Sequence, residues 1–137
     1  MLVYLAGPID HAIGHEWRDE IRELLGPDVS FFDPLGAFQN VKPGCPIDVC
    51  QRVYDVNSCA ISMSNAMVLF AKPSPEVFMV GSWRELEIAR RYNTPVCIVT
   101  DKNSVYMFDA KVVGHLEEAA YWVKELMISN ERAGERG

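Results

Sequence analysis

Residues 66–71 of this 137-residue chain read AMVLFA, and residues 95–100 read PVCIVT. Both stretches are apolar almost without interruption, as strands of a parallel sheet are when helices cover both of its faces. The segment from Gly81 to Tyr92 between them has the residue types and the length of a helix. The order strand, helix, strand predicts a parallel pair of strands joined by a crossover helix.

The same alternation extends in both directions along the chain. Short apolar runs predict strands at Val3–Ala6 and Val29–Phe32, and helical periodicity predicts helices around Trp17–Leu25, Pro46–Met63 and Leu116–Met127. A short strand at Val105–Phe108 is a further candidate, and Asp33–Pro46, rich in Pro and Gly, is expected to be a loop. We therefore predict one α/β domain over residues 1–128, with a parallel sheet of four to five strands and helices on both faces, followed by a polar tail at 129–137.

Composition excludes several classes of protein. The chain has 13 Lys and Arg against 19 Asp and Glu, a net charge of −6, so a nucleic-acid polymer is not an expected partner. No apolar run is long enough to span a bilayer, and residues 1–6 lack the basic start of a signal peptide. We therefore expect no membrane partner and a cytoplasmic location.

The four cysteines, Cys45, Cys50, Cys59 and Cys97, form no C-x-x-C pair. A zinc site or a disulfide framework would favour regular spacing, and a cytoplasmic protein keeps its thiols reduced. We expect reduced cysteines that serve as small apolar side chains, and no metal site.

Ligands of parallel α/β sheets bind beyond the carboxyl ends of the strands. Gly7 ends the first predicted strand, where a residue without a side chain lets backbone amides approach a ligand, although a plain turn would also explain it. Glu85 is expected in the first turn of the helix that follows the third strand, where the helix dipole would keep its carboxylate ionised. Such a carboxylate suits attack on a sugar C1 atom, but Glu85 and Glu87 could also simply favour a helix start.

Three short motifs resemble one known family. Tyr-x-Ala-Gly-Pro-Ile begins at Tyr4, Gly-Ser-x-x-Glu-Leu begins at Gly81, and Pro-Val-x-Ile-Val begins at Pro95. Together they resemble the nucleoside 2-deoxyribosyltransferase superfamily, which includes nucleoside 5′-monophosphate N-glycoside hydrolases. The resemblance covers roughly residues 1–100 and implies a flavodoxin-like, Rossmann-like sheet. It also implies a homodimer or higher homo-oligomer in which a neighbouring subunit completes the site.

The resemblance implies roles for individual residues. Glu85 matches the glutamate that attacks C1′, and Tyr4 matches the tyrosine that contacts this glutamate. Substrate-binding positions would be Gly7, Pro8, Ile9, Gly81, Ser82, a phosphate-binding Ser74 and, in trans, Asn103 or Ser104.

Two departures from the family pattern concern the leaving base. Asn57 stands where the family has an acid on the second helix, so that protonation of the base is left to Asp55 or is lost. Met79 replaces an aspartate that binds the base in the transferases.

We therefore expect cleavage of the N-glycosidic bond of a nucleoside or deoxynucleoside 5′-monophosphate without a cofactor, with Asn57 or Asp55 handling the base. The alternatives are base exchange by a deoxyribosyltransferase and a non-catalytic nucleotide-binding protein of the same fold.

Overall fold

The computed structural model describes residues 1–7, 14–37, 44–72, 80–102, 107 and 109–136. Its centre is a sheet of five parallel strands in the order β2-β1-β3-β4-β5. The strands are β1 (Leu2–Ala6), β2 (Ser30–Phe32), β3 (Ala66–Phe70), β4 (Val96–Val99) and β5 (Lys111–Val113). Every residue of β4 is buried, and only the last residue of β3 is not, which explains their continuously apolar sequences.

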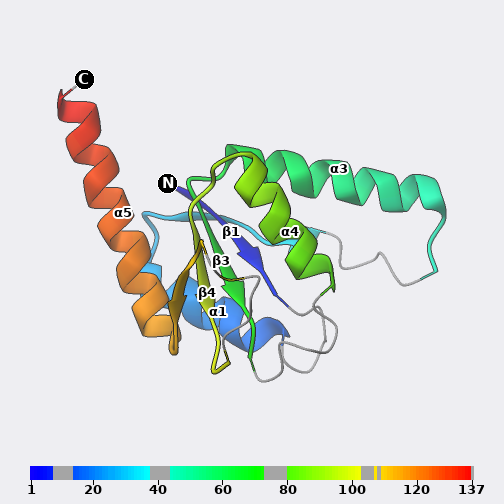
Figure 1. The fold of residues 1–137 in the computed structure, drawn as a ribbon, viewed down its shortest axis with the longest axis horizontal. Coiled ribbons are helices and arrows are strands. Elements are labelled where there is room, and N and C mark those ends of the chain that lie inside the picture. Colours follow the sequence, from blue (N-terminus) through cyan, green and yellow to red (C-terminus); the bar gives the residue numbers. More distant parts are fainter. Residues whose placement is uncertain (8–13, 38–43, 73–79, 103–106, 108, 137) are drawn as a thin grey trace.

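Helices cover both faces of this sheet, as predicted (Figure 1). Helices α1 (Gly14–Leu25) and α5 (Leu116–Arg136) pack together on one face, and α3 (Ile47–Met63) and α4 (Val80–Arg91) lie on the other. Side chains on the two faces of the sheet pack into two separate apolar cores. Trp17, Ile21 and Leu25 bring α1 into the first core, and Ile61 and Leu86 bring α3 and α4 into the second.

Three details differ from the prediction. The fifth strand is Lys111–Val113; Met107 lies outside any strand, and the other positions of the predicted 105–108 strand lie outside the described residues. The predicted loop after β2 begins with a short helix, α2 (Pro34–Ala37), which Pro34 starts because its fixed φ suits the first helical position. The last helix does not end near Met127, because residues 128–133 contain no Gly or Pro to stop it.

The strand order fixes where a ligand can bind. From β1 the chain crosses to β2 on one side, while β3 pairs with β1 on the other side, so the order of strands reverses between β1 and β3. In open parallel sheets the crevice beyond the carboxyl ends of such a strand pair holds the ligand. Among the described helices, none is both long and apolar enough to cross a membrane.

Candidate functional site

Tyr4 and Glu85 meet at the inner face of α4. Tyr4 is fully buried in β1 and its ring stacks on Phe32 of β2, with ring centroids 5.5 Å apart. Glu85 lies in α4, and its Oε2 atom is buried. The two groups lie close enough to affect each other's charge: the Tyr4 hydroxyl lowers the pKa of Glu85, and Glu85 raises the pKa of Tyr4. Their contact is looser than a full hydrogen bond, since neither Tyr4 Oη nor Glu85 Oε2 has a partner of ordinary hydrogen-bond geometry among the described residues.

The expected electrostatics of Glu85 are wrong in one respect. Helix α4 begins at Val80, so Glu85 lies beyond the first turn. The helix dipole acts most strongly within that first turn. Burial raises the pKa of Glu85 to about 7, although the Tyr4 hydroxyl and the positive charge of Arg18 both act to lower it. Near neutral pH the protonated and ionised forms of the carboxyl group are therefore both populated, and it is not held fully ionised.

Arg18 and Asp33 complete a buried cluster that sequence patterns did not reveal. Arg18 lies in α1 and is only 1% exposed, and its Nε donates to Asp33 Oδ1 at 2.8 Å. Arg22 Nη2 donates to the second oxygen, Oδ2, at 2.8 Å. The charge of Arg18 acts on both Tyr4 and Glu85. We call Tyr4, Arg18, Asp33 and Glu85 the buried charge cluster.

A signal for Arg18 was present in the sequence. Arg18 precedes Ile21 by three residues and Leu25 by seven, so it lies on the buried side of α1 by helical phase. A charged residue at such a position must have a partner, because an isolated buried charge is very costly. Asp33, directly after the second predicted strand, is the acid with which the fold pairs it.

The remaining predicted site residues fall into three groups. Asn57 is half-buried on α3, and its Oδ1 atom is buried without a described hydrogen-bond partner, whereas Asp55 is exposed. Gly81 and Ser82 lie in the first turn of α4, where the structure describes their place in the helix but not the surroundings of the Ser82 side chain. Pro8, Ile9, Ser74, Asn103 and Ser104 lie outside the described residues, as does Met79.

Gly7 is required for packing between helix and sheet. A Cβ atom at Gly7 would lie 2.7 Å from Cζ2 of Trp17 and 3.3 Å from the Phe70 carbonyl oxygen. Trp17 cannot withdraw easily, because it is 3% exposed and its ring stacks on Phe70 with centroids 5.1 Å apart. Close approach is thus the reason for glycine here, and the group that approaches is the Trp17 indole.

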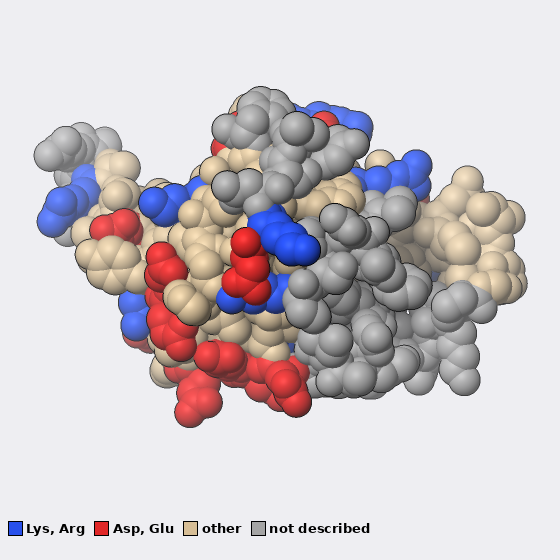
Figure 2. All heavy atoms as spheres, turned by 60° about the horizontal axis from the view of Figure 1, so that its bottom comes forward, with Lys and Arg blue, Asp and Glu red and all other residues tan. Residues whose placement is uncertain are grey.

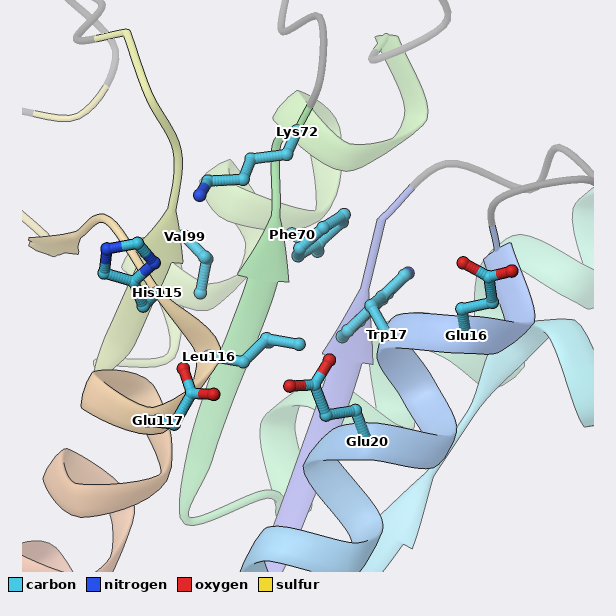
Figure 3. Close-up of a pocket in the computed structure, with 9 residues that line it drawn as sticks. All are labelled: Glu16, Trp17, Glu20, Phe70, Lys72, Val99, His115, Leu116 and Glu117. Carbon is cyan, nitrogen blue, oxygen red and sulfur yellow. The ribbon is translucent and has the colours of Figure 1, made fainter.

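A second feature of this edge is a hollow on the face of the sheet that α1 and α5 cover. It has a volume of about 310 Å³, and the Trp17 and Phe70 rings form one wall, with Glu20 reaching from α1 toward Leu116 (Figure 3). We call this cavity the acidic hollow. It is lined by Glu16, Trp17, Glu20, Phe70, Lys72, Val99, His115, Leu116 and Glu117.

The acidic hollow has an exposed rim. Glu16, Glu20 and Glu117 are all exposed, and Lys72 Nζ is bound to Asp101 Oδ1 at 3.0 Å. Figure 2 looks toward this edge and shows Asp and Glu side chains gathered at the lower border of the view. Within the described part of the chain, no three His, Cys, Asp or Glu side chains are grouped so as to hold a metal ion.

Comparison with known proteins supports the fold. No family model and no curated protein matches the sequence. A 2-deoxyribosyltransferase from the psychrotolerant bacterium Bacillus psychrosaccharolyticus superposes with a TM-score of 0.71 over 88% of this chain and 90% of its own, at 12% identity. The CMP N-glycosidase BcmB from Clostridium botulinum gives a TM-score of 0.58 over 90% of this chain and 98% of its own, also at 12% identity.

Both solved structures belong to the nucleoside 2-deoxyribosyltransferase superfamily, so the fold that the sequence resemblance implied is confirmed. At this level of identity the likeness concerns the fold alone.

Proposed function

We propose that this chain cleaves the N-glycosidic bond of a nucleoside 5′-monophosphate and that Glu85 is the nucleophile. The observation that carries the proposal is the position of Glu85, a buried carboxyl group facing the Tyr4 hydroxyl near the strand pair where the sheet order reverses. A carboxylate in a site shielded from water is less well solvated, which favours bonding to a cationic sugar C1′.

The proposed reaction has two steps. In the first, a carboxylate oxygen of Glu85 forms an ester bond to C1′ as the C1′–N bond breaks, and the base departs with the bonding electrons. In the second, water attacks C1′ and releases Glu85 as a carboxylate, and the proton that the water loses goes to the departed base, which becomes the free base. The Tyr4 hydroxyl stays protonated, because burial and then the charge of Glu85 raise its pKa. It can therefore donate to the carboxylate and orient it throughout both steps.

Asn57 limits how the base can be handled. An amide has no proton to release at neutral pH, but a buried, unpartnered Oδ1 can accept a hydrogen bond from an amino or N–H group of the base. Asn57 would therefore orient the base rather than protonate it. Asp55 also lies on α3 but is exposed, whereas Asn57 is half-buried. Asp55 would therefore have to reach the base from a more exposed position than Asn57.

Hydrolysis is preferred over transfer on the basis of sequence. Met79 takes the place of the aspartate that binds the base in the transferases, and Pro73-Ser74 matches the phosphate-binding loop of the hydrolases. Of the two structural relatives, one is a CMP N-glycosidase and the other is a 2-deoxyribosyltransferase, so the fold is compatible with either reaction. A nucleotide-binding protein without catalysis is the third candidate, favoured by the amide at Asn57 in place of an acid.

We also propose that the chain forms a homo-oligomer through α3. Ile47, Tyr54 and Ile61 follow one another at intervals of seven residues and so lie along one line of the helix. Ile61 is fully buried, whereas Ile47 is 75% exposed and Tyr54 is 46% exposed. The amino half of α3 extends away from the sheet (Figure 1), and there the exposed Ile47 and Tyr54 continue the line of the buried Ile61. Sedimentation of the purified protein at several concentrations tests this proposal, and a monomer throughout would refute it.

The experiment that tests the proposed function is base release, followed by chromatography. Ribonucleosides, deoxyribonucleosides and their 5′-monophosphates are incubated with the protein, with and without a second free base. We expect free base from the monophosphates alone. Exchange that requires the second base would indicate a transferase, and binding of intact nucleotide without release would indicate the non-catalytic alternative.

Two variants on the same helix provide a matched pair. Glu85→Gln should lower base release by at least about a thousandfold, as is common when a nucleophile is removed. Glu87→Gln changes an exposed glutamate two positions away and should leave release unchanged. Equal loss in both variants would show that the effect does not come from a nucleophile at Glu85.

The pH dependence supplies a second test. Only ionised Glu85 can attack C1′, and its pKa is raised to about 7 by burial. We therefore expect kcat/KM to rise with pH up to about 7 and to level off above it. A profile that is flat between about pH 5 and pH 8 would contradict the assigned role.

A further inference from the structure

Two thiols that four residues separate in the sequence meet at the amino end of α3. Cys45 Sγ and Cys50 Sγ lie 3.1 Å apart, and Cys50 Sγ also lies 3.7 Å from the Cys45 carbonyl oxygen, to which it can donate. We propose that Cys45 and Cys50 form a reactive dithiol that closes to an intramolecular disulfide by exchange with a low-molecular-weight disulfide such as oxidised glutathione.

The local backbone holds the two sulfur atoms in place. Gly44 adopts a φ of 85°, a left-handed conformation that favours glycine, and Pro46 is extended with φ −56° and ψ 151°. The amides of Val49 and Cys50 then donate to the Pro46 carbonyl oxygen at 3.0 and 3.1 Å, which forms the first turn of α3. This arrangement turns residue 45 back over residue 50. Bond formation needs the sulfur atoms to approach by only about 1 Å, to the usual S–S length.

Exposure makes this pair the preferred site of exchange. In the single chain Cys50 is exposed and Cys45 is partly exposed, so a small disulfide in solution can reach Cys50 while the α3 face proposed above as an interface is not covered by a second copy. Cys59 is also exposed, but its Sγ lies 3.9 Å from Met63 Sδ, and it has no thiol partner among the described residues. Cys97 is buried within β4, where burial raises its pKa to about 12 and keeps it unreactive. The expectation that the cysteines serve as small apolar side chains therefore fits Cys97 alone.

The exchange proceeds in two balanced steps. The thiolate of Cys50 attacks one sulfur of the small disulfide, which breaks that S–S bond and releases one small thiol. The thiolate of Cys45 then attacks the Cys50 sulfur and expels the second small thiol. The two protons lost by the cysteines are taken up by the released thiols. The pKa of Cys45 is raised, chiefly by its hydrogen bond with Cys50.

The test uses the full chain and does not depend on its enzymatic activity. The reduced protein is incubated with glutathione buffers of increasing oxidised fraction, quenched with acid, alkylated and analysed by intact and peptide mass spectrometry. We expect a mass loss of about 2 Da and the loss of two alkylated thiols, which digestion locates to Cys45 and Cys50. Cys59→Ser should behave as the wild type, because it removes an exposed thiol outside the pair.

The single variant of the pair traps the first step. In Cys45→Ser, Cys50 has no partner thiol, so a stable mixed disulfide with glutathione should accumulate at Cys50. The proposal is overturned if the wild-type protein instead carries glutathione equally on Cys50 and Cys59, with no internal disulfide at any buffer composition. Circular dichroism of each variant verifies that the fold is kept.

Discussion

Two regions near the carboxyl edge of the sheet carry their charges in opposite ways. In the buried charge cluster, Arg18 and Asp33 are 1% and 9% exposed at the side chain, and Glu85 has a raised pKa. In the acidic hollow, the carboxylates stand on the rim in water, and Lys72 and Asp101 form an ion pair that is 21% and 65% exposed. Charges that remain hydrated are inexpensive to hold, whereas buried ones must be balanced by a partner.

This difference indicates where chemistry can occur. A large number of charges does not by itself mark a site, because the acidic hollow has more carboxylates than the buried charge cluster. What distinguishes the cluster is the buried Oε2 atom of Glu85, which has no hydrogen-bond partner of ordinary geometry among the described residues. Such an arrangement lowers stability and is most often retained for function.

The largest effect should follow from Arg18→Met. Removal of the guanidinium takes one of its two described cations from the buried Asp33 and leaves Arg22. Loss of one partner of a buried ion pair typically lowers the free energy of unfolding by about 3 to 4 kcal/mol. Urea denaturation measures this change. Lys72→Met, which breaks the exposed ion pair of the acidic hollow, should cost less than about 1 kcal/mol. Similar costs for the two variants would remove the distinction between the regions.

Glu85→Gln should stabilise the protein in alkaline solution. The folded-state pKa of about 7 lies above the ordinary value of 4.5, so the folded protein binds the extra proton. The stability that this proton provides is fully present below about pH 4.5 and is lost as pH rises through about 7. At about pH 8 the variant should be more stable by up to about 3 kcal/mol, and at about pH 4 the difference should vanish. A pH-independent difference would refute the burial of an ionisable Glu85.

Gly7→Ala tests the contact between α1 and the carboxyl end of β1. The new Cβ would lie 2.7 Å from the Trp17 ring, so we expect a loss of about 1 to 3 kcal/mol through forced repacking. Gly36→Ala is the matched control, since nothing lies within 4 Å of the corresponding Cβ. Thermal unfolding of both variants gives the comparison, and an undiminished melting temperature for Gly7→Ala would show that Trp17 can move aside.

Tyr4→Phe should change the titration of Glu85 more than it changes stability. The hydroxyl has no full hydrogen-bond partner among the described residues, so its removal should alter the unfolding free energy by less than about 1 kcal/mol. The pKa of Glu85 should rise, because the hydroxyl acts to lower it. Carbon-13 NMR of labelled glutamate side chains measures this pKa, with Tyr121→Phe, a change at an exposed residue, as control. An unchanged pKa would mean that Tyr4 does not contact Glu85.

Sequence patterns predicted the fold well where burial determines residue type. The strands at Ala66–Phe70 and Val96–Val99 follow from continuous apolar runs, and α3 was placed within one residue of its observed start. β5 was misplaced because it has three residues and Lys111 is exposed, so its pattern carries little signal. Helix ends outside the core, such as that of α5, depend on local residues and are hard to predict.

The site was predictable only in part. Short motifs singled out Glu85 and Tyr4 as candidates, and the structure brings these two side chains together. Arg18 and Asp33 were not found: helical phase places Arg18 on the inner side of its helix, but its pairing with Asp33 joins two elements that only the fold brings together. The raised pKa of Glu85 likewise depends on burial in three dimensions, which the position of Glu85 in the sequence could not supply.

The most direct test of the central claim is to trap the ester on Glu85. The protein is mixed with a nucleoside 5′-monophosphate that it cleaves, quenched in acid within a single turnover, digested and analysed by mass spectrometry. We expect the mass of the sugar phosphate on the peptide that contains Glu85, and no such adduct on Glu85→Gln. Base release from Glu85→Gln at the wild-type rate, or no adduct and no release from the wild-type protein with any nucleotide, would contradict the account.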